Sequence, residues 1–289
     1  MIQRLRTAPL VLALLAAASA DAQVGSYLRV MSWNLRHEGW QGETDFRADA
    51  QQIWNVFGST STSPNGCDVV FLQEVMNKDV PINLVNDLAQ VSGYTWSYVV
   101  TAPIGRTTYK EHYAMVYRTD RVKVVSSYLY NDVGDKFERE PLVVKLVDKA
   151  TGADYTFIDW HAVFGTNAQR AAELAEIATV FRSVQDSDAT DQDVILLGDH
   201  NADATSTWWN TFKTTVAPPP ACTLNIATSR RTPPARSRLR LRLLLDAAEV
   251  RHRVLDVGPR LRGRHGELLQ PPLDHAPVWL KLYSTSDTD

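Results

Sequence analysis

Short apolar and alternating runs recur along almost the whole chain, and no other feature restricts its possible folds as strongly. They include "YLRVMSWNL" near the N-terminus, "CDVVFLQEV", "TWSYVV", "DYTFIDWHAV", "DVILLGDHN" and, at the end, "HAPVWLKLY". Such runs predict β-strands, and helical spacing is clearest in residues 168–185. Many strands with few helices between them favour a single α/β sandwich, in which two packed sheets form the core and helices cover the outside.

The size of the chain fits one such domain. It has 289 residues, 44% of them hydrophobic, so it can bury a full core. Lys and Arg total 30 and Asp and Glu total 33, which gives a formal net charge of −3. A charge this small points to no polyanionic partner by itself.

The N-terminus "MIQRLRTAPLVLALLAAASADAQ" has two Arg residues, a short apolar run and then small residues. This pattern predicts a signal peptide over residues 1–22, a mature domain over 23–289, and a secreted or periplasmic location. A membrane anchor is the alternative, but the apolar run is short for spanning a bilayer. Export permits a disulfide between Cys67 and Cys222, although the sequence does not show that they meet.

Residues 229–271 differ in composition from the rest of the chain. No Lys occurs between Lys213 and Lys281 and no aromatic residue between Phe212 and Trp279, while Arg is abundant, as in "RSRLRLRLLLDAAEVRHR". A basic arm for nucleic acid and a solvated basic helix are two interpretations. We favour a third, translation out of frame, because a strand-rich domain is not expected to lose every aromatic residue over such a length.

The genetic code is compatible with the frame interpretation. If "RLRLRLLL" (238–245) is encoded by CGN and CTN codons, reading one nucleotide later permits Ala-Tyr-Asp-Tyr-Val-Tyr-Tyr, which has the aromatic character of a strand. The normal frame is expected to return near residues 271–274.

Polar side chains end or follow several predicted strands. The oxygen-bearing ones are Asn34, Glu74, Glu111, Asp199, Asn201 and Asp274, and the imidazoles are His161 and His275. Oxygen ligands suit a hard cation such as Mg²⁺, Mn²⁺ or Ca²⁺, and imidazoles beside a hydrolytic centre suit acid–base catalysis. Taken singly, each residue has a simpler explanation. Glu74 fits a carboxylate at a helix start, and His161 fits a hydrogen-bonded core histidine.

The order of these motifs is more specific than any one of them. A strand Asn, then Q-E-V, Y-K-E, a strand His, G-D-x-N-A-D and a terminal D-H-x-P-V resemble the endonuclease/exonuclease/phosphatase superfamily. "GRTTYKEHYAMVYR", "FEREPLVVK" and "GDHNAD" are most similar to its deoxyribonuclease I branch. The resemblance covers 28–283 except the Arg-rich stretch. It implies a four-layer α/β/β/α sandwich, a monomer, and a divalent cofactor, Mg²⁺ or Mn²⁺, with a further use of Ca²⁺ left open.

The resemblance also implies a role for each matching residue. The metal-binding set is Asn34, Glu74 and Asp274. The catalytic set is His161, His275, Glu111, Asp199 and Asn201, with Glu111 fixing the tautomer of His161 and with Asp199 and Asn201 meeting the phosphate and its water. The positions that contact DNA are Arg139, Tyr109 and Asn201.

The chain also departs from the family pattern. His200 stands where the family usually has Phe, which is a tolerable change that could add a cation near the phosphate. "HAVFG" replaces a more polar sequence after His161, and Met76 stands where an Arg often reaches into the minor groove. The Tyr-Asp strand whose Asp braces the second His is absent. Asp246 is the nearest carboxylate, but its surroundings do not match the motif.

The leading hypothesis is therefore a secreted, metal-dependent nuclease that hydrolyses DNA by His-assisted attack of water. The same fold is compatible with a sphingomyelinase-like or phosphoinositide phosphodiesterase. The missing Asp also allows a binding protein without turnover. The sequence does not say which of His161 and His275 is the base.

Overall fold

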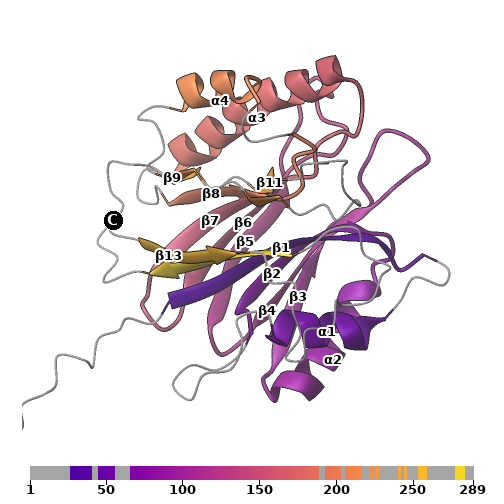
Figure 1. The fold of residues 1–289 in the computed structure, drawn as a ribbon, viewed down its shortest axis with the longest axis vertical. Helices are drawn as coiled ribbons and strands as arrows, with labels where there is room; N and C mark the ends of the chain where they lie inside the picture. The colour runs from indigo at the N-terminus through magenta and orange to yellow at the C-terminus, as the bar shows by residue number, and fades with distance from the viewer. Residues whose placement is uncertain are drawn as a thin grey trace, which may run out of the picture.

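The described part of the chain forms four layers in a computed structural model. Residues 27–40, 45–55, 66–188, 193–202, 206–216 and 277–283 are described, together with the backbone of short strands between residues 222 and 258. Two β-sheets pack face to face, with α1 and α2 outside one sheet and α3 and α4 outside the other (Figure 1). The predicted two-sheet α/β sandwich is confirmed.

Within the described residues, the first sheet has the strand order β13-β14-β1-β2-β4-β3. Its strands are β1 (Tyr27–Glu38), β2 (Val69–Val75), β3 (Trp96–Val100), β4 (His112–Arg118), β13 (Arg253–Gly258) and β14 (Val278–Tyr283). The pair β1–β2 is parallel, and the other neighbours are antiparallel.

The second sheet has the order β5-β6-β7-β8 and also contains one parallel pair, β7–β8. Its strands are β5 (Val122–Leu129), β6 (Leu142–Asp148), β7 (Asp154–Asp159) and β8 (Val194–Leu197). Two short two-stranded ladders pair β9 (Cys222–Thr223) with β12 (Leu244–Leu245) and β10 (Ile226–Ala227) with β11 (Arg240–Leu241).

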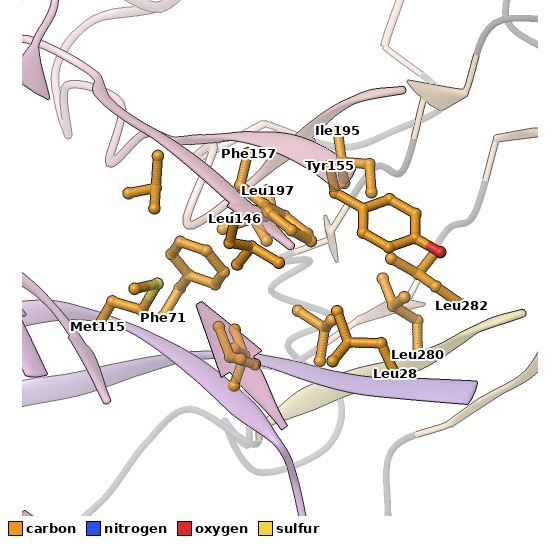
Figure 2. Packing of buried hydrophobic residues seen from close by; sticks show 14 of the residues in the cluster. Leu28, Phe71, Met115, Leu146, Tyr155, Phe157, Ile195, Leu197, Leu280 and Leu282 are labelled. Carbon is orange, nitrogen blue, oxygen red and sulfur yellow. The ribbon is translucent and has the colours of Figure 1, made fainter. Parts of the chain in front are cut away.

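Strand side chains alternate between two cores because successive residues point to opposite faces of a sheet. In β8, Ile195 and Leu197 enter the core between the sheets, while Val194 and Leu196 enter the core under the helices. Figure 2 shows the inter-sheet core, where Phe71 of the first sheet lies 5.0 Å from Phe157 of the second, measured between ring centroids. Both faces of β8 are buried, which explains its continuous apolar run.

The helices cover the outer faces. They are α1 (Phe46–Asn55), α2 (Val80–Ser92), α3 (Asn167–Ser187) and α4 (Trp209–Thr215). The helical spacing in residues 168–185 is therefore confirmed as α3. Its start is fixed by a capping box, in which the Thr166 side chain accepts the Gln169 N–H and the Gln169 side chain accepts the Thr166 N–H.

Several sequence predictions fall outside the described residues. The predicted signal peptide (1–22) and most of the Arg-rich segment (229–271) are among them. Part of that segment forms β13, which pairs with β14 at the edge of the first sheet. The frame hypothesis concerns the gene and stays a prediction.

Two further findings concern the cysteines and the helices. Cys67 is a free, fully buried thiol in this structure, so the disulfide left open above is not formed. Among the described helices, none is both long and apolar enough to span a membrane.

Candidate active site

The candidate site lies where the two parallel strand pairs end. Asn34 is on β1, Glu74 on β2, and His161 and Asp199 follow β7 and β8. Carboxyl ends of parallel strands meet at one edge of a sheet, and here the edges of both sheets face each other. The structure therefore brings together residues that the sequence separates by up to 165 positions, as between Asn34 and Asp199.

Local backbone distortions aim these side chains. The β1–β2 register shifts between Asn34 and Glu38, and the β2–β4 register shifts after Leu72. Glu74 has φ +56° and His37 has φ +62°, in the left-handed region that non-glycine residues rarely adopt. Bulges of this kind redirect side chains beside functional sites. Strain held at this position indicates a functional constraint on Glu74.

Asn34 links the two central carboxylates. Its Nδ2 donates hydrogen bonds of 2.8 Å to Glu74 Oε1 and 2.9 Å to Asp199 Oδ2, while its Oδ1 accepts the Arg36 N–H. The Glu74 side chain is 14% exposed and that of Asp199 3%. Two carboxylates that share one amide form a strongly negative centre with little water around it.

His161 lies beside this centre and is held by Glu111. Its Nδ1 is 2.7 Å from Glu111 Oε1, and its Nε2 is 3.8 Å from Glu74 Oε1 and 4.0 Å from Asp199 Oδ2. Burial alone would lower the pKa of His161, but the charge of Glu111, its hydrogen bond to the ring and the charge of Asp199 together raise the pKa overall. The pair thus directs Nε2 at the carboxylates and stabilises a protonated ring.

Arg139 pairs with the same Glu111 carboxylate that contacts His161. Its Nε is 3.0 Å from Glu111 Oε1, and its side chain is only 8% exposed. Its guanidinium carbon lies 5.9 Å from the centre of the Tyr109 ring. Arg139 thus compensates the negative charge of the Glu111 carboxylate that contacts His161. The predicted contacts of Arg139 and Tyr109 with DNA stay predictions.

The turn after β8 is shaped by Gly198. A Cβ at Gly198 would lie 2.2 Å from the carbonyl oxygen of Trp160, so only glycine lets the turn approach β7 this closely. The Asn201 N–H donates to Asp199 Oδ1 over 3.0 Å, and Asn201 Nδ2 donates to the Ala162 carbonyl over 2.8 Å. The Asn201 side chain therefore holds the G-D-x-N turn against the segment that follows His161.

His200 does not line the site. Its ring is fully buried, 5.4 Å from both the Trp160 and the Trp209 rings, in the core under α3 and α4. The suggestion that His200 adds a cation near the phosphate is therefore wrong. The residue takes the place of a core aromatic.

Three residues that support the site were not predicted from the sequence. Gln73 Nε2 donates to Asp159 Oδ1 over 2.7 Å across the two sheets, and Tyr113 accepts the His161 N–H at its hydroxyl over 2.8 Å. Burial raises the pKa of Asp159 well above its ordinary value. Gln73 precedes Glu74, and Asp159 lies two positions before His161. Polar residues within apolar strands were the signal that could have found both.

The described residues contain part of the donor set predicted for a hard divalent cation. No group of three His, Cys, Asp or Glu side chains suited to a metal occurs among the described residues, and the predicted ligand Asp274 and the second imidazole His275 both lie outside them. Glu74 nevertheless presents a carboxylate beside Asn34 and Asp199 with no Lys or Arg paired to it among the contacts of the described part. Mg²⁺ is commonly held by one or two carboxylates with water.

Comparison with known proteins agrees with this geometry. Residues 31–285 match the Endonuclease/Exonuclease/phosphatase family. The chain belongs to this family. Deoxyribonuclease-1 of Sus scrofa is 30% identical over 226 residues, covering 74% of this chain and 75% of the relative. Deoxyribonuclease-1 of Gallus gallus is 32% identical over 204 residues, covering 68% of each.

Solved structures of other proteins have the same fold. D. rerio TDP2 complexed with single strand DNA product has a TM-score of 0.59 at 17% identity, covering 90% of this chain and 100% of that chain. A family member from Bacteroides thetaiotaomicron has a TM-score of 0.57 at 18% identity, covering 89% and 98%. Family membership and the deoxyribonuclease relatives together support a nuclease or phosphodiesterase, and thus a phosphodiester hydrolase.

Proposed function

We propose that the chain is a secreted, divalent-metal-dependent endonuclease that hydrolyses phosphodiester bonds of DNA. The 2.7 Å contact between His161 Nδ1 and Glu111 Oε1 carries this proposal, because it leaves Nε2 directed toward Glu74 and Asp199. The relatives named Deoxyribonuclease-1 support DNA as the substrate. The signal-peptide pattern at the N-terminus supports export.

His161 is the group that moves a proton. A phosphodiester is an anion, so hydrolysis requires deprotonation of the attacking water and protonation of the leaving oxygen. Nε2 faces the reacting centre, and the Glu111 carboxylate stabilises the charge that Nε2 gains when it takes a proton. Arg139 pairs with Glu111 and helps to hold that carboxylate in place. His275 is proposed as the partner for the other transfer.

The carboxylates and amides bind and orient. Glu74 and Asn34, together with Asp274, would hold a divalent cation, which when bound supplies positive charge to the phosphate and increases the acidity of water. Asp199 accepts hydrogen bonds and orients the water. Asn201 uses one N–H on the Ala162 carbonyl, so its second N–H remains for a phosphoryl oxygen.

The substrate class is tested with two assays run side by side. Supercoiled plasmid and sphingomyelin vesicles are incubated with the chain in excess Mg²⁺ or in EDTA. The unaltered chain should nick weakly or not at all, because it lacks the Asp that braces the second His. For a variant in which residues 229–271 carry the shifted-frame translation, we expect relaxed and linear plasmid in Mg²⁺, none in EDTA, and no phosphocholine release. Phosphocholine release without nicking would instead indicate a lipid phosphodiesterase, and retention of plasmid without nicking would indicate a binding protein.

A further inference from the structure

Three aromatic rings gather at one border of the candidate site. His37 stacks on Trp40 with ring centroids 4.7 Å apart and an interplanar angle of 29°. Tyr109 meets both rings edge-on, with each centroid distance 5.7 Å. The Trp40 side chain is 47% exposed, so the cluster presents an open aromatic surface to solvent. We call His37, Trp40 and Tyr109 the aromatic platform.

A tight backbone turn at residues 37–40 positions two rings of the platform. The Trp40 N–H donates to the His37 carbonyl over 3.0 Å, and Gly39 between them has φ +98°. A Cβ at Gly39 would lie 2.7 Å from Val80 Cγ2, so the turn also packs closely on the start of α2. This tight turn places the rings of residues 37 and 40 on the same side. The stacked rings hold the indole in one orientation while almost half of its side chain stays open to solvent, which suits a binding role.

The platform contacts Glu74 of the candidate site through His37. His37 Nε2 is 3.2 Å from Glu74 Oε2, and the Tyr109 hydroxyl donates to Met76 Sδ over 3.6 Å. The guanidinium carbon of Arg139, which pairs with Glu111, lies 5.9 Å from the centre of the Tyr109 ring. A nucleotide with its phosphate at Glu74 would therefore place a neighbouring base over these rings.

We propose that the aromatic platform is a stacking site for one unpaired nucleobase next to the scissile phosphate, a proposal that rests on the proposed function. Flat aromatic faces bind nucleobases of any sequence by stacking. Duplex DNA hides its base faces within the stack, so a base must be unstacked before it can lie on these rings. The chain should therefore favour single-stranded or locally opened DNA over intact duplex.

The test measures binding without cleavage. A fluorescent oligothymidylate and an oligonucleotide of the same length built from abasic residues are titrated with the full chain in EDTA, and anisotropy gives both dissociation constants. We expect oligothymidylate to bind on the order of tenfold more tightly than the abasic strand. Trp40→Ala should remove this difference, and Trp40→Phe should keep most of it.

Tyr128 on β5 provides the matched control, because its side chain is also 47% exposed but lies outside the platform. Tyr128→Ala should bind both oligonucleotides as the unmodified chain does. Equal affinity of the unmodified chain for the two strands, including no binding to either, would overturn the inference, as would an unchanged preference in Trp40→Ala. Because the readout needs no catalysis, a failed nicking assay and a failed stacking site are distinguishable.

Discussion

The Nδ1 atom of His161 lies 2.7 Å from Oε1 of Glu111, and the same Glu111 oxygen lies 3.0 Å from Nε of Arg139. All three side chains are buried. One carboxylate thus orients the imidazole and is itself compensated by a guanidinium. This arrangement fixes one nitrogen of His161 toward Glu111 and leaves the other for proton transfer.

The Glu111→Gln variant should separate these two tasks. The amide keeps a hydrogen-bonding group near His161, so the nicking rate should fall less than in His161→Ala. It also leaves the buried Arg139 charge uncompensated, which should cost about 3–5 kcal/mol of stability. Nicking rate and thermal melting are measured on both variants. A larger rate loss in Glu111→Gln than in His161→Ala would contradict the bracing role.

Glu74→Ala should abolish nicking while leaving the fold intact. The change removes a carboxylate from the reacting centre, and its side chain contributes little to the apolar core because it contacts Asn34 and His37. Plasmid relaxation in excess Mg²⁺ and a thermal melt check the two halves of the prediction. Relaxation at the unmodified rate would remove Glu74 from the proposed metal set.

The Asp49 carboxyl on α1 should make stability fall with rising pH. Burial, and secondarily the charge of Asp45, raises the pKa of Asp49 from 3.8 to about 7. The folded state therefore holds this proton more tightly than the unfolded state, and stability falls between about pH 4 and 7 and levels off above. Asp49→Asn should stabilise the chain by up to about 4 kcal/mol at pH 8.

The control for Asp49 is the same pair of proteins below pH 4. Both then carry an uncharged side chain at position 49, so their melting temperatures should agree closely. Denaturant unfolding at the two pH values measures the difference. An Asp49→Asn variant no more stable at pH 8 than the parent would show that this carboxyl is not held protonated.

Repair of the Arg-rich segment should increase both expression and activity. In the frame hypothesis, residues 229–271 lack the strand that carries the carboxylate bracing His275. Loss of such a bracing group alone can lower a rate by about 10⁴. The repaired variant carries the shifted-frame translation read from the gene. If the unaltered chain melts cooperatively and nicks as fast as the repaired variant, the frame hypothesis is refuted and a basic arm is favoured.

Local patterns predicted much of this fold and part of the site. The apolar run before Gly198 predicted β8, and the spacing in residues 168–185 predicted α3, because periodicity reports burial directly. His161 and Glu111 were among the polar residues that end or follow predicted strands, the family resemblance paired them, and the structure places them in contact.

Other features depend on contacts distant in sequence. The Gln73–Asp159 bond joins residues 86 positions apart, and the left-handed conformation of Glu74 arises at a bulge that no local pattern marks. The burial of His200 between Trp160 and Trp209 depends on packing between β7, the turn after β8 and α4. The aromatic platform also needs Tyr109 to meet a turn about 70 residues earlier, a proximity set by the sheet order.

The most direct test of the central claim is plasmid nicking by the repaired variant and by its His161→Ala form, each in excess Mg²⁺ and in EDTA. The account predicts nicking by the repaired variant only in Mg²⁺. It predicts a rate lower by on the order of 10² to 10⁴ in the His161→Ala form, the usual contribution of a positioned proton-transfer group. Nicking by the repaired variant in EDTA, or an unchanged rate in the His161→Ala form, would contradict it.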